Sequence, residues 1–286
     1  MNITYLESFT DYLLEEEMSK GTIEGYTIDI KGFIRFVGKD IQMIKRIDVN
    51  QYKEHLRDSK LKTITINRKL VSIKRFIDFL NERFNIGLNI RITQEKIQKQ
   101  YSLTDDDLLS EDDYLKLMNV IESAGDVRIK AVFETMYYSG MRVSEALQLR
   151  VDHVQDGIKV IEDIKGKGNK YRPIFISDKL METLKDYLSV RKQPYSSNTN
   201  ALFVGQRGAI TRQTVHNEMK KYAALSNIPT QKAHAHNLRH LFGLRLAAKG
   251  VVIEDIAKFM GHTSIETTKI YLEKPQSHYA SLIDAL

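Results

Sequence analysis

The stretch His236-Asn237-Leu238-Arg239, followed by Gly261-His262 and then by Tyr271, decides how this sequence is interpreted. It gathers side chains that bind phosphate around a single tyrosine hydroxyl. His236 and Arg239 are three residues apart, so on a helix they project from one face and can hold the same phosphate. The pattern therefore predicts a phosphoryl-transfer site in a helical part of the chain.

Two stretches further upstream add cationic groups to this set. Gly140-Met141-Arg142-Val143-Ser144-Glu145 places Arg142 at the start of an expected helix, where anions bind favourably. Residues 158–161 and 171–176 have the pattern of two strands, joined by a glycine-rich turn. Lys165, Lys167 and Lys170 lie in this turn, and each is a candidate for a functional lysine.

Composition limits the class of protein. The chain has 286 residues, 42% of them hydrophobic, which suffices for two domains with buried cores. It has no cysteine, which excludes disulfides and thiolate metal sites and favours a cytoplasmic protein. No run approaches the roughly 20 apolar residues of a membrane span, and residues 1–7 do not resemble a signal peptide.

The distribution of charge indicates a polyanionic partner. The net charge is +6, and residues 51–100 carry 12 Lys and Arg against 5 Asp and Glu. Residues 1–50 carry 6 against 9, so the basic character is concentrated in one part of the chain. Concentrated positive charge is suited to nucleic acid phosphates, and one face is predicted to meet them.

Hydrophobic periodicity predicts two units joined by a polar linker. Helices are expected over residues 5–14, 22–37 and 65–83, with Thr22 as an N-cap, and Asp48 is expected to open another helix as the first residue of a capping box. The periodicity is lost between residues 85 and 107. The expected boundaries are a helical domain at 1–90, a linker at 91–103 and a second domain at 104–286.

The second domain is expected to be helical on both sides of the hairpin. Ser110 is placed to begin a capping box, and the chain after Asp178 again has a helical pattern. Gly261 is expected to end one helix, and Ser264 to cap the next, which carries Tyr271.

Each candidate also has a plainer interpretation. Arg142 and Arg239 could be ordinary surface arginines, and Tyr271 could be a core tyrosine. His236 and His240 are four residues apart and could form a zinc pair, although no cysteine or HExxH glutamate accompanies them. The candidates are distinguished by the joint occurrence of their motifs.

In these motifs the chain resembles the tyrosine recombinases of the phage integrase family, especially the compact Xer-type recombinases and transposon resolvases. The matching features are R-V-S-E from Arg142, the lysine turn, H-x-x-R from His236, G-H at His262 and T-T-x-x-Y ending at Tyr271. The resemblance implies a mainly α fold, with an N-terminal SAM-like helical core-binding domain. A mixed α/β catalytic domain, mostly helical with a small antiparallel sheet, would complete a C-shaped clamp around DNA. No additional arm-binding domain is expected before residue 1.

The resemblance also implies the roles of the site residues. Six are expected to act in the reaction: Arg142, Lys167, His236, Arg239, His262 and Tyr271. Tyr271 would be the nucleophile of a 3′-phosphotyrosyl intermediate, and Lys167 would protonate the leaving oxygen. The arginines would stabilise the phosphate, the histidines would bind it or move the tyrosine proton, and Glu145 would orient its neighbours. No cofactor and no metal are expected.

In the N-terminal domain, a polar and basic helix face is expected to contact the DNA backbone. The candidate residues are Thr22, Thr63, Asn67, Arg68, Lys69, Ser72, Lys74 and Arg75. A merely solvated face is the alternative. The expected partners are double-stranded DNA with inverted half-sites and the protein itself, as a dimer on a site and a tetramer in the synapse, with accessory proteins left open.

The resemblance implies a site-specific recombinase that acts through a Holliday junction, in chromosome dimer resolution, transposon cointegrate resolution or mobile-element integration. Two alternatives remain. A type IB topoisomerase-like enzyme would use the same chemistry to relax supercoils, and a non-catalytic protein would bind DNA without cutting it.

The tail after Tyr271 carries a short apolar stripe at helical spacing, formed by Tyr279, Leu282, Ile283 and Leu286. A segment this short is not stable alone, so it is expected to dock. A neighbouring subunit is the favoured surface, and its own domain is the alternative.

Overall fold

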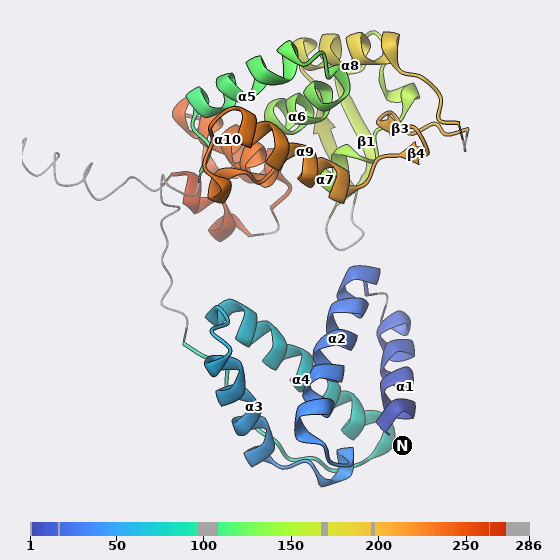
Figure 1. The fold of residues 1–286 in the computed structure, drawn as a ribbon, viewed down its shortest axis with the longest axis vertical. Coiled ribbons are helices and arrows are strands. Elements are labelled where there is room, and N and C mark those ends of the chain that lie inside the picture. Colours follow the sequence, from blue (N-terminus) through green and yellow to red (C-terminus); the bar gives the residue numbers. More distant parts are fainter. Residues whose placement is uncertain are drawn as a thin grey trace, which may run out of the picture. The chain divides into compact units, whose positions relative to one another are not determined.

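The computed structural model describes residues 2–16, 18–96, 108–166, 171–195, 198–262 and 264–272. The chain divides into two compact units, Met1–Lys99 and Gln100–Leu286, and each has its own hydrophobic core. Figure 1 draws both as ribbons and labels their helices and strands where there is room. Within the described ranges, no helix is both long enough and apolar enough to cross a membrane.

The first unit is a small helical bundle, as predicted. Its α-helices are α1 (Asn2–Glu15), α2 (Lys20–Val37), α3 (Arg46–Asp58) and α4 (Thr63–Phe84). Each helix turns one apolar stripe inward, and the stripes meet around Phe9, Phe33 and Phe76, whose side chains are almost fully buried. The rings of Phe9 and Phe76 pack edge to face, with centroids 5.1 Å apart.

Two helix starts in this unit differ from the sequence-based prediction. The N-cap of α2 is Ser19, whose hydroxyl accepts the backbone N–H of Thr22 at 3.3 Å, so the prediction of Thr22 as the cap is wrong. Asp48 lies inside the first turn of α3, where its carboxylate accepts the backbone N–H of Lys45 at 2.8 Å. Thr22 and Asp48 both lie within the first turn, a position that periodicity alone does not distinguish from the cap.

The second unit is mostly helical. Its α-helices are α5 (Glu111–Ser123), α6 (Val127–Ser139), α7 (Val143–Ala146), α8 (Asp178–Val190), α9 (Arg212–Leu225), α10 (His236–Ala248) and α11 (Ile253–Met260). α6 is buried on most sides, because α8 and α10 both pack against it. The capping box at Ser110 is confirmed, since Ser110 and Asp113 exchange side-chain to backbone hydrogen bonds of 3.0 Å.

The predicted hairpin is present in the second unit. β1 (Val160–Lys165) pairs antiparallel with β2 (Tyr171–Phe175), and Lys165 lies opposite Tyr171 at the end nearest the turn. The turn residues Lys167 and Lys170 lie outside the described residues.

A second small hairpin, β3 (Val204–Gly205) and β4 (Gly208–Ala209), lies in the region that was expected to be helical. Strands of two residues carry no measurable periodicity, so the sequence does not predict them.

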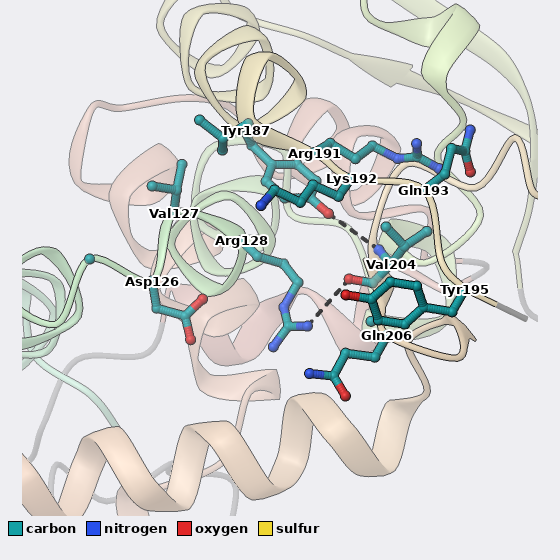
Figure 2. Close-up of a pocket in the computed structure, with 13 residues that line it drawn as sticks. Asp126, Val127, Arg128, Tyr187, Arg191, Lys192, Gln193, Tyr195, Val204 and Gln206 are labelled. Atoms are coloured by element: carbon teal, nitrogen blue, oxygen red, sulfur yellow. Dashed lines mark hydrogen bonds between the residues drawn. The ribbon is translucent and has the colours of Figure 1, made fainter.

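A cavity of about 760 Å³ lies beside this second hairpin, at the N-terminal end of α6 and the C-terminal end of α8 (Figure 2). Two arginines that line it donate hydrogen bonds to backbone carbonyls. Arg128 donates to the carbonyl of Val204 at 3.3 Å, and Arg191 donates to the carbonyl of Leu202 at 2.9 Å. The hydroxyl of Tyr187 accepts the N–H of Val204 at 3.3 Å. These bonds tie the hairpin to α6 and α8.

The last described segment is the part that differs most from the prediction. Gly261 caps α11 in the left-handed conformation, with φ of 59°, as expected. Two short 3₁₀ turns follow, Ile265–Thr267 and Lys269–Tyr271. Tyr271 therefore lies on a tight turn, and the prediction of one helix that begins at Ser264 and carries Tyr271 is wrong. Ser264 precedes the first 3₁₀ turn only, and its side chain makes no capping hydrogen bond. The tail proposed to dock on another subunit lies outside the described residues.

Candidate active site

Glu145 is at the centre of the site. It lies on the one-turn helix α7, and its side chain is only 1% exposed. One carboxylate oxygen accepts hydrogen bonds from Arg172 at 2.6 Å and from the backbone N–H of Arg142 at 2.8 Å, and the other accepts from the Arg142 guanidinium at 2.7 Å. A guanidinium nitrogen of Arg239 lies 3.8 Å away. Three positive side chains thus share one buried negative charge.

The ionisation of Glu145 follows from these contacts. Burial raises its pKa, but the hydrogen bonds and charge of Arg172, followed by the bonds from Arg142, lower it further, so the pKa lies below the usual value. The carboxylate is therefore charged at neutral pH and can orient the guanidinium groups around it.

Arg239 joins the ends of two helices. Its side chain is 1% exposed, and its two terminal nitrogens donate to the carbonyl of Gly140, the C-cap of α6, and to the carbonyl of Met260, the last residue of α11. Such terminal carbonyls lack partners within their own helices. Burial, and then the charge of Arg142, lowers the pKa of Arg239 to about 9, which leaves it charged at neutral pH.

Gly261, the glycine of the G-H motif, leaves room for the arginine cluster. Arg142 donates to its carbonyl at 3.4 Å. Arg172, from β2, donates to the carbonyl of Phe259 at 2.8 Å, and its side chain passes directly over Gly261, where a Cβ would collide with it. Glycine is therefore required here for space as well as for its left-handed φ.

Tyr271 is buried against α10. Its side chain is 5% exposed, and a Cβ placed on Gly243 would lie 2.8 Å from carbons of the tyrosine ring. The hydroxyl makes a hydrogen bond with Nδ1 of His240 at 3.0 Å. Burial raises the pKa of Tyr271 to about 12, although the charges of Arg239 and Arg142 act in the opposite direction. The hydroxyl therefore keeps its proton at neutral pH in the free protein.

Of the other two histidines, His262 contacts the tyrosine and His236 contacts His240. The ring of His262 stacks on that of Tyr271, with centroids 6.2 Å apart, and its Nδ1 bonds to the hydroxyl of Thr268 at 2.9 Å. Burial, followed by the charge of Arg239, lowers the pKa of His262 to about 4, so it is neutral. His236 begins α10, is exposed, and meets the ring of His240 edge to face at 4.6 Å.

A surface pocket of about 350 Å³ opens beside these groups. Arg142 and His236 line one part of it, and Arg212 and His216 of α9 line another. The pocket is therefore positively charged and connects the site to solvent.

The structure gathers most of the residues predicted for the reaction. The residues brought together are Arg142, Glu145, His236, Arg239, His262 and Tyr271. Lys167 lies outside the described residues, so its assignment stays a prediction.

The sequence did not predict two contacts, those of Arg172 with Glu145 and of His240 with Tyr271. From the sequence, His240 is a candidate only as one half of a zinc pair with His236. Its position four residues after His236, on the same face of α10, was the available signal. In the described ranges no group of three or more His, Asp or Glu side chains is placed to hold a metal ion.

The predicted DNA-contacting face of α4 is partly buried. Asn67 is 7% exposed, and its amide bonds to both the N–H and the carbonyl of Glu95, at 2.7 and 2.9 Å. Ser72 is fully buried and donates to Asp29 at 2.8 Å. The prediction that these two residues face DNA is wrong, because chain segments distant in sequence cover them.

The basic residues of the same helix lie nearer the surface. Arg68 and Lys69 bond to the buried Asp29, and the Arg68 side chain is still 49% exposed. Thr63 is exposed and Thr22 partly so. Two further cations are in exposed ion pairs, Lys74 with Asp78 and Arg75 with Glu16. Exposed pairs of this kind are weak, so these residues remain candidates for phosphate contacts.

Comparisons with known proteins agree with this geometry. The family model for the Phage integrase family matches residues 107–278, and that for the Phage integrase N-terminal SAM-like domain matches residues 6–83. The chain is 29% identical to a tyrosine recombinase of Thermosipho africanus, over 93% of this chain and 94% of that protein. It is 27% identical to the TnP I resolvase of Bacillus thuringiensis, over 98% and 99%.

The fold is similar to that of the XerH site-specific recombinase bound to a palindromic difH substrate. The TM-score is 0.74, with 22% identity, over 92% of this chain and 80% of that one. The predicted fold class is confirmed: a SAM-like helical domain precedes a mostly helical unit with small antiparallel sheets.

The match to the catalytic family model covers more than half of the sequence, so the chain belongs to the phage integrase family. It is a site-specific tyrosine recombinase, and its relatives include Xer-type enzymes.

Proposed function

We propose that this recombinase binds double-stranded DNA at inverted half-sites, cleaves each strand through Tyr271 and joins it to a partner strand through a Holliday junction. The helical domain at 1–90 and the catalytic domain at 104–286, joined by the linker at 91–103, would form a clamp on the duplex. One dimer would occupy a site, and two would form the tetrameric synapse. The palindromic difH substrate bound by the similarly folded XerH recombinase supports a DNA partner with inverted half-sites.

The observation that carries the proposal is the cluster of Arg142, Arg172 and Arg239 around buried Glu145, close to Tyr271. Cleavage of a phosphodiester places negative charge on the non-bridging oxygens in the transition state, and fixed cations stabilise that charge without reorganising. Arg142 is 25% exposed, so part of its planar fork is open toward the pocket that it lines.

In the proposed reaction, the Tyr271 oxygen attacks the scissile phosphorus and the bond from phosphorus to the 5′ oxygen breaks. The products are a 3′-phosphotyrosyl link and a 5′ hydroxyl, which takes its proton from Lys167. A 5′ hydroxyl of the partner strand then attacks the phosphotyrosine and releases the enzyme. Arg142 and Arg239 stabilise the phosphate in both steps, and His236 and His262 contact it.

The proposal is tested by trapping the protein covalently on DNA in its own host and sequencing the attached fragments. We expect the fragments to share one pair of inverted half-sites, and we expect the purified protein to resolve a Holliday junction built from that sequence. Attachment without any common sequence, together with plasmid relaxation and no junction resolution, would support topoisomerase-like activity instead. The genomic position of the site separates dimer resolution, cointegrate resolution and integration.

A further inference from the structure

The histidine that is hydrogen-bonded to the hydroxyl of the proposed nucleophile is not one of the two assigned from the sequence. The Tyr271 hydroxyl lies 3.0 Å from Nδ1 of His240. His262 stacks on the tyrosine ring, but its Nδ1 is engaged by Thr268. His236 contacts the His240 ring and lies at the surface.

One face of α10 contacts both the ring and the hydroxyl of Tyr271. His240 and Gly243 are three residues apart, so they lie side by side on the helix. Gly243 leaves the space for the ring, and His240 receives the hydroxyl. The nucleophilic oxygen is therefore directed by a rigid element, as a reacting group requires.

We propose that His240 is the base that accepts the proton of Tyr271 when the tyrosine attacks DNA. The inference rests on the proposed function, in which Tyr271 is the nucleophile. As the bond from the tyrosine oxygen to phosphorus forms, the phenolic proton moves to Nδ1 of His240. In the reverse reaction the resulting imidazolium returns the proton to the departing tyrosine oxygen, so the proton balance closes over the cycle.

The protonation states of the pair are those that the transfer requires. Burial, followed by the charges of His236 and Arg239, lowers the pKa of His240 to about 4, so the imidazole is neutral and can accept a proton. When the ring proton of the neutral imidazole is on Nε2, Nδ1 is the acceptor and the Tyr271 O–H donates to it.

In the free protein the proton remains on the tyrosine, whose pKa is far higher than that of His240. Transfer occurs during attack for two reasons. A bound phosphate anion raises the pKa of a nearby imidazole, and the tyrosine oxygen loses its basicity as it bonds to phosphorus.

If His240 moves the proton, the other two histidines, His236 and His262, contact the phosphate. His236 lines the positively charged pocket with Arg142.

The test uses the full chain and a nicked suicide substrate built from the site trapped in the host, with the rate of covalent complex formation measured in a single turnover. His240→Gln keeps a hydrogen-bond acceptor but cannot take up a proton. We expect it to bind the substrate within about twofold of the wild type and to cleave about 10²–10⁴-fold more slowly, the range of general base catalysis. His55→Gln, an exposed histidine of α3, is the matched control and should keep the full rate.

His240→Ala supplies a second readout. Removal of the ring leaves a space beside the Tyr271 hydroxyl, and imidazole added to the solution should restore cleavage in proportion to its neutral fraction as pH is raised. A role in packing alone would give no such dependence on pH.

Full cleavage by His240→Gln would overturn the proposal, as would a slow His240→Ala variant that folds and binds DNA but does not respond to imidazole. Absence of a covalent complex in the wild type, or its persistence in Tyr271→Phe, would instead show that the proposed function fails.

Discussion

The carboxylate of Glu145 is a single negative charge among three guanidinium groups, and it is 1% exposed. Removing one partner of a buried ion pair typically costs about 3–5 kcal/mol, because the remaining charges stay buried without compensation. The geometry of the phosphate-binding cations therefore depends on this one residue, which does not itself need to touch DNA.

Glu145→Gln keeps the shape of the side chain and removes its charge. Because the pKa of Glu145 is lowered in the folded protein, its stabilising effect is fully present above its unfolded value of about 4.3 and is lost as pH falls through the lower folded value. We expect the free energy of unfolding, measured in urea, to be higher for the wild type than for the variant at pH 7. The difference should shrink toward pH 3.

The matched control for that experiment is Glu122→Gln, which breaks the exposed pair with Lys130. Its effect should stay within about 1 kcal/mol at pH 7. A difference for Glu145→Gln that is the same at both pH values would show that the charge of Glu145 does not hold the cluster.

Gly243→Ala tests the position of the tyrosine ring. The new Cβ would lie 2.8 Å from the ring carbons, so Tyr271 must shift, and a misplacement of about 1 Å can cost about 10²-fold in rate. We expect cleavage of a suicide substrate to fall by about that factor while DNA affinity is retained.

Gly25→Ala is the control for Gly243→Ala, because it also lies inside a helix but its Cβ would meet its nearest neighbour at 3.8 Å, an ordinary contact. This variant should cleave at the wild-type rate. Equal rates for the two variants would mean that the ring is not held by α10 during the reaction.

At the scale of elements, the helices with a clear apolar stripe and the β1–β2 hairpin were predicted from the sequence, because their cores repeat with a local period. The errors fall where local chemistry is ambiguous. Thr22 and Ser19 both suit a cap, and the decision depends on which backbone N–H each can reach. The segment carrying Tyr271 forms tight 3₁₀ turns, in which buried Thr268 is hydrogen-bonded to His262. A contact of this kind leaves no periodic pattern in the sequence.

The C-cap of α11 provides a prediction for a single element. Gly261 and Gly38 both end helices with left-handed φ, 59° and 62°, so alanine costs each roughly 1–2 kcal/mol of backbone strain. A Cβ at Gly38 meets nothing within 4 Å, whereas at Gly261 it would collide with Arg172. We expect Gly261→Ala to be the more destabilising by a further 1–3 kcal/mol, roughly the cost of overpacking.

Hydrogen exchange of peptides from α11 and α2 measures the two effects separately, since each reports the free energy of its own opening. If the two substitutions lower the free energy of opening equally, Gly261 is not required to leave room for Arg172.

At the scale of the whole molecule, the sequence motifs predict residues that the structure brings together, Lys167 apart, but not the contacts that organise them. Arg172 of β2 bonds to Glu145 of α7, and Asp29 of α2 accepts from Ser72 of α4. Such pairings depend on tertiary structure. For the same reason Asn67 and Ser72 looked like surface residues and are buried.

The basic character of the first unit gives a prediction for the full chain. Lys74→Ala removes one cation proposed to contact a phosphate, so the slope of log K against log salt should fall by about 1, for cognate and random DNA alike. Lys116→Ala is the control, because Lys116 is in a similar exposed pair, with Asp112 of α5. Equal slopes for Lys74→Ala and the wild type would show that Lys74 contacts no phosphate and that this face of α4 is merely solvated.

The role of Tyr271 as the nucleophile is tested by determining which residue becomes covalently linked to DNA. The full chain is reacted with the suicide substrate, the covalent complex is digested with protease, and the peptide attached to the 3′ phosphate is sequenced by mass spectrometry. We expect a phosphotyrosyl peptide with the link on Tyr271, and no covalent complex from Tyr271→Phe, although that variant still binds DNA. A link on Tyr279 or any other residue, or a covalent complex that persists in Tyr271→Phe, would contradict this role.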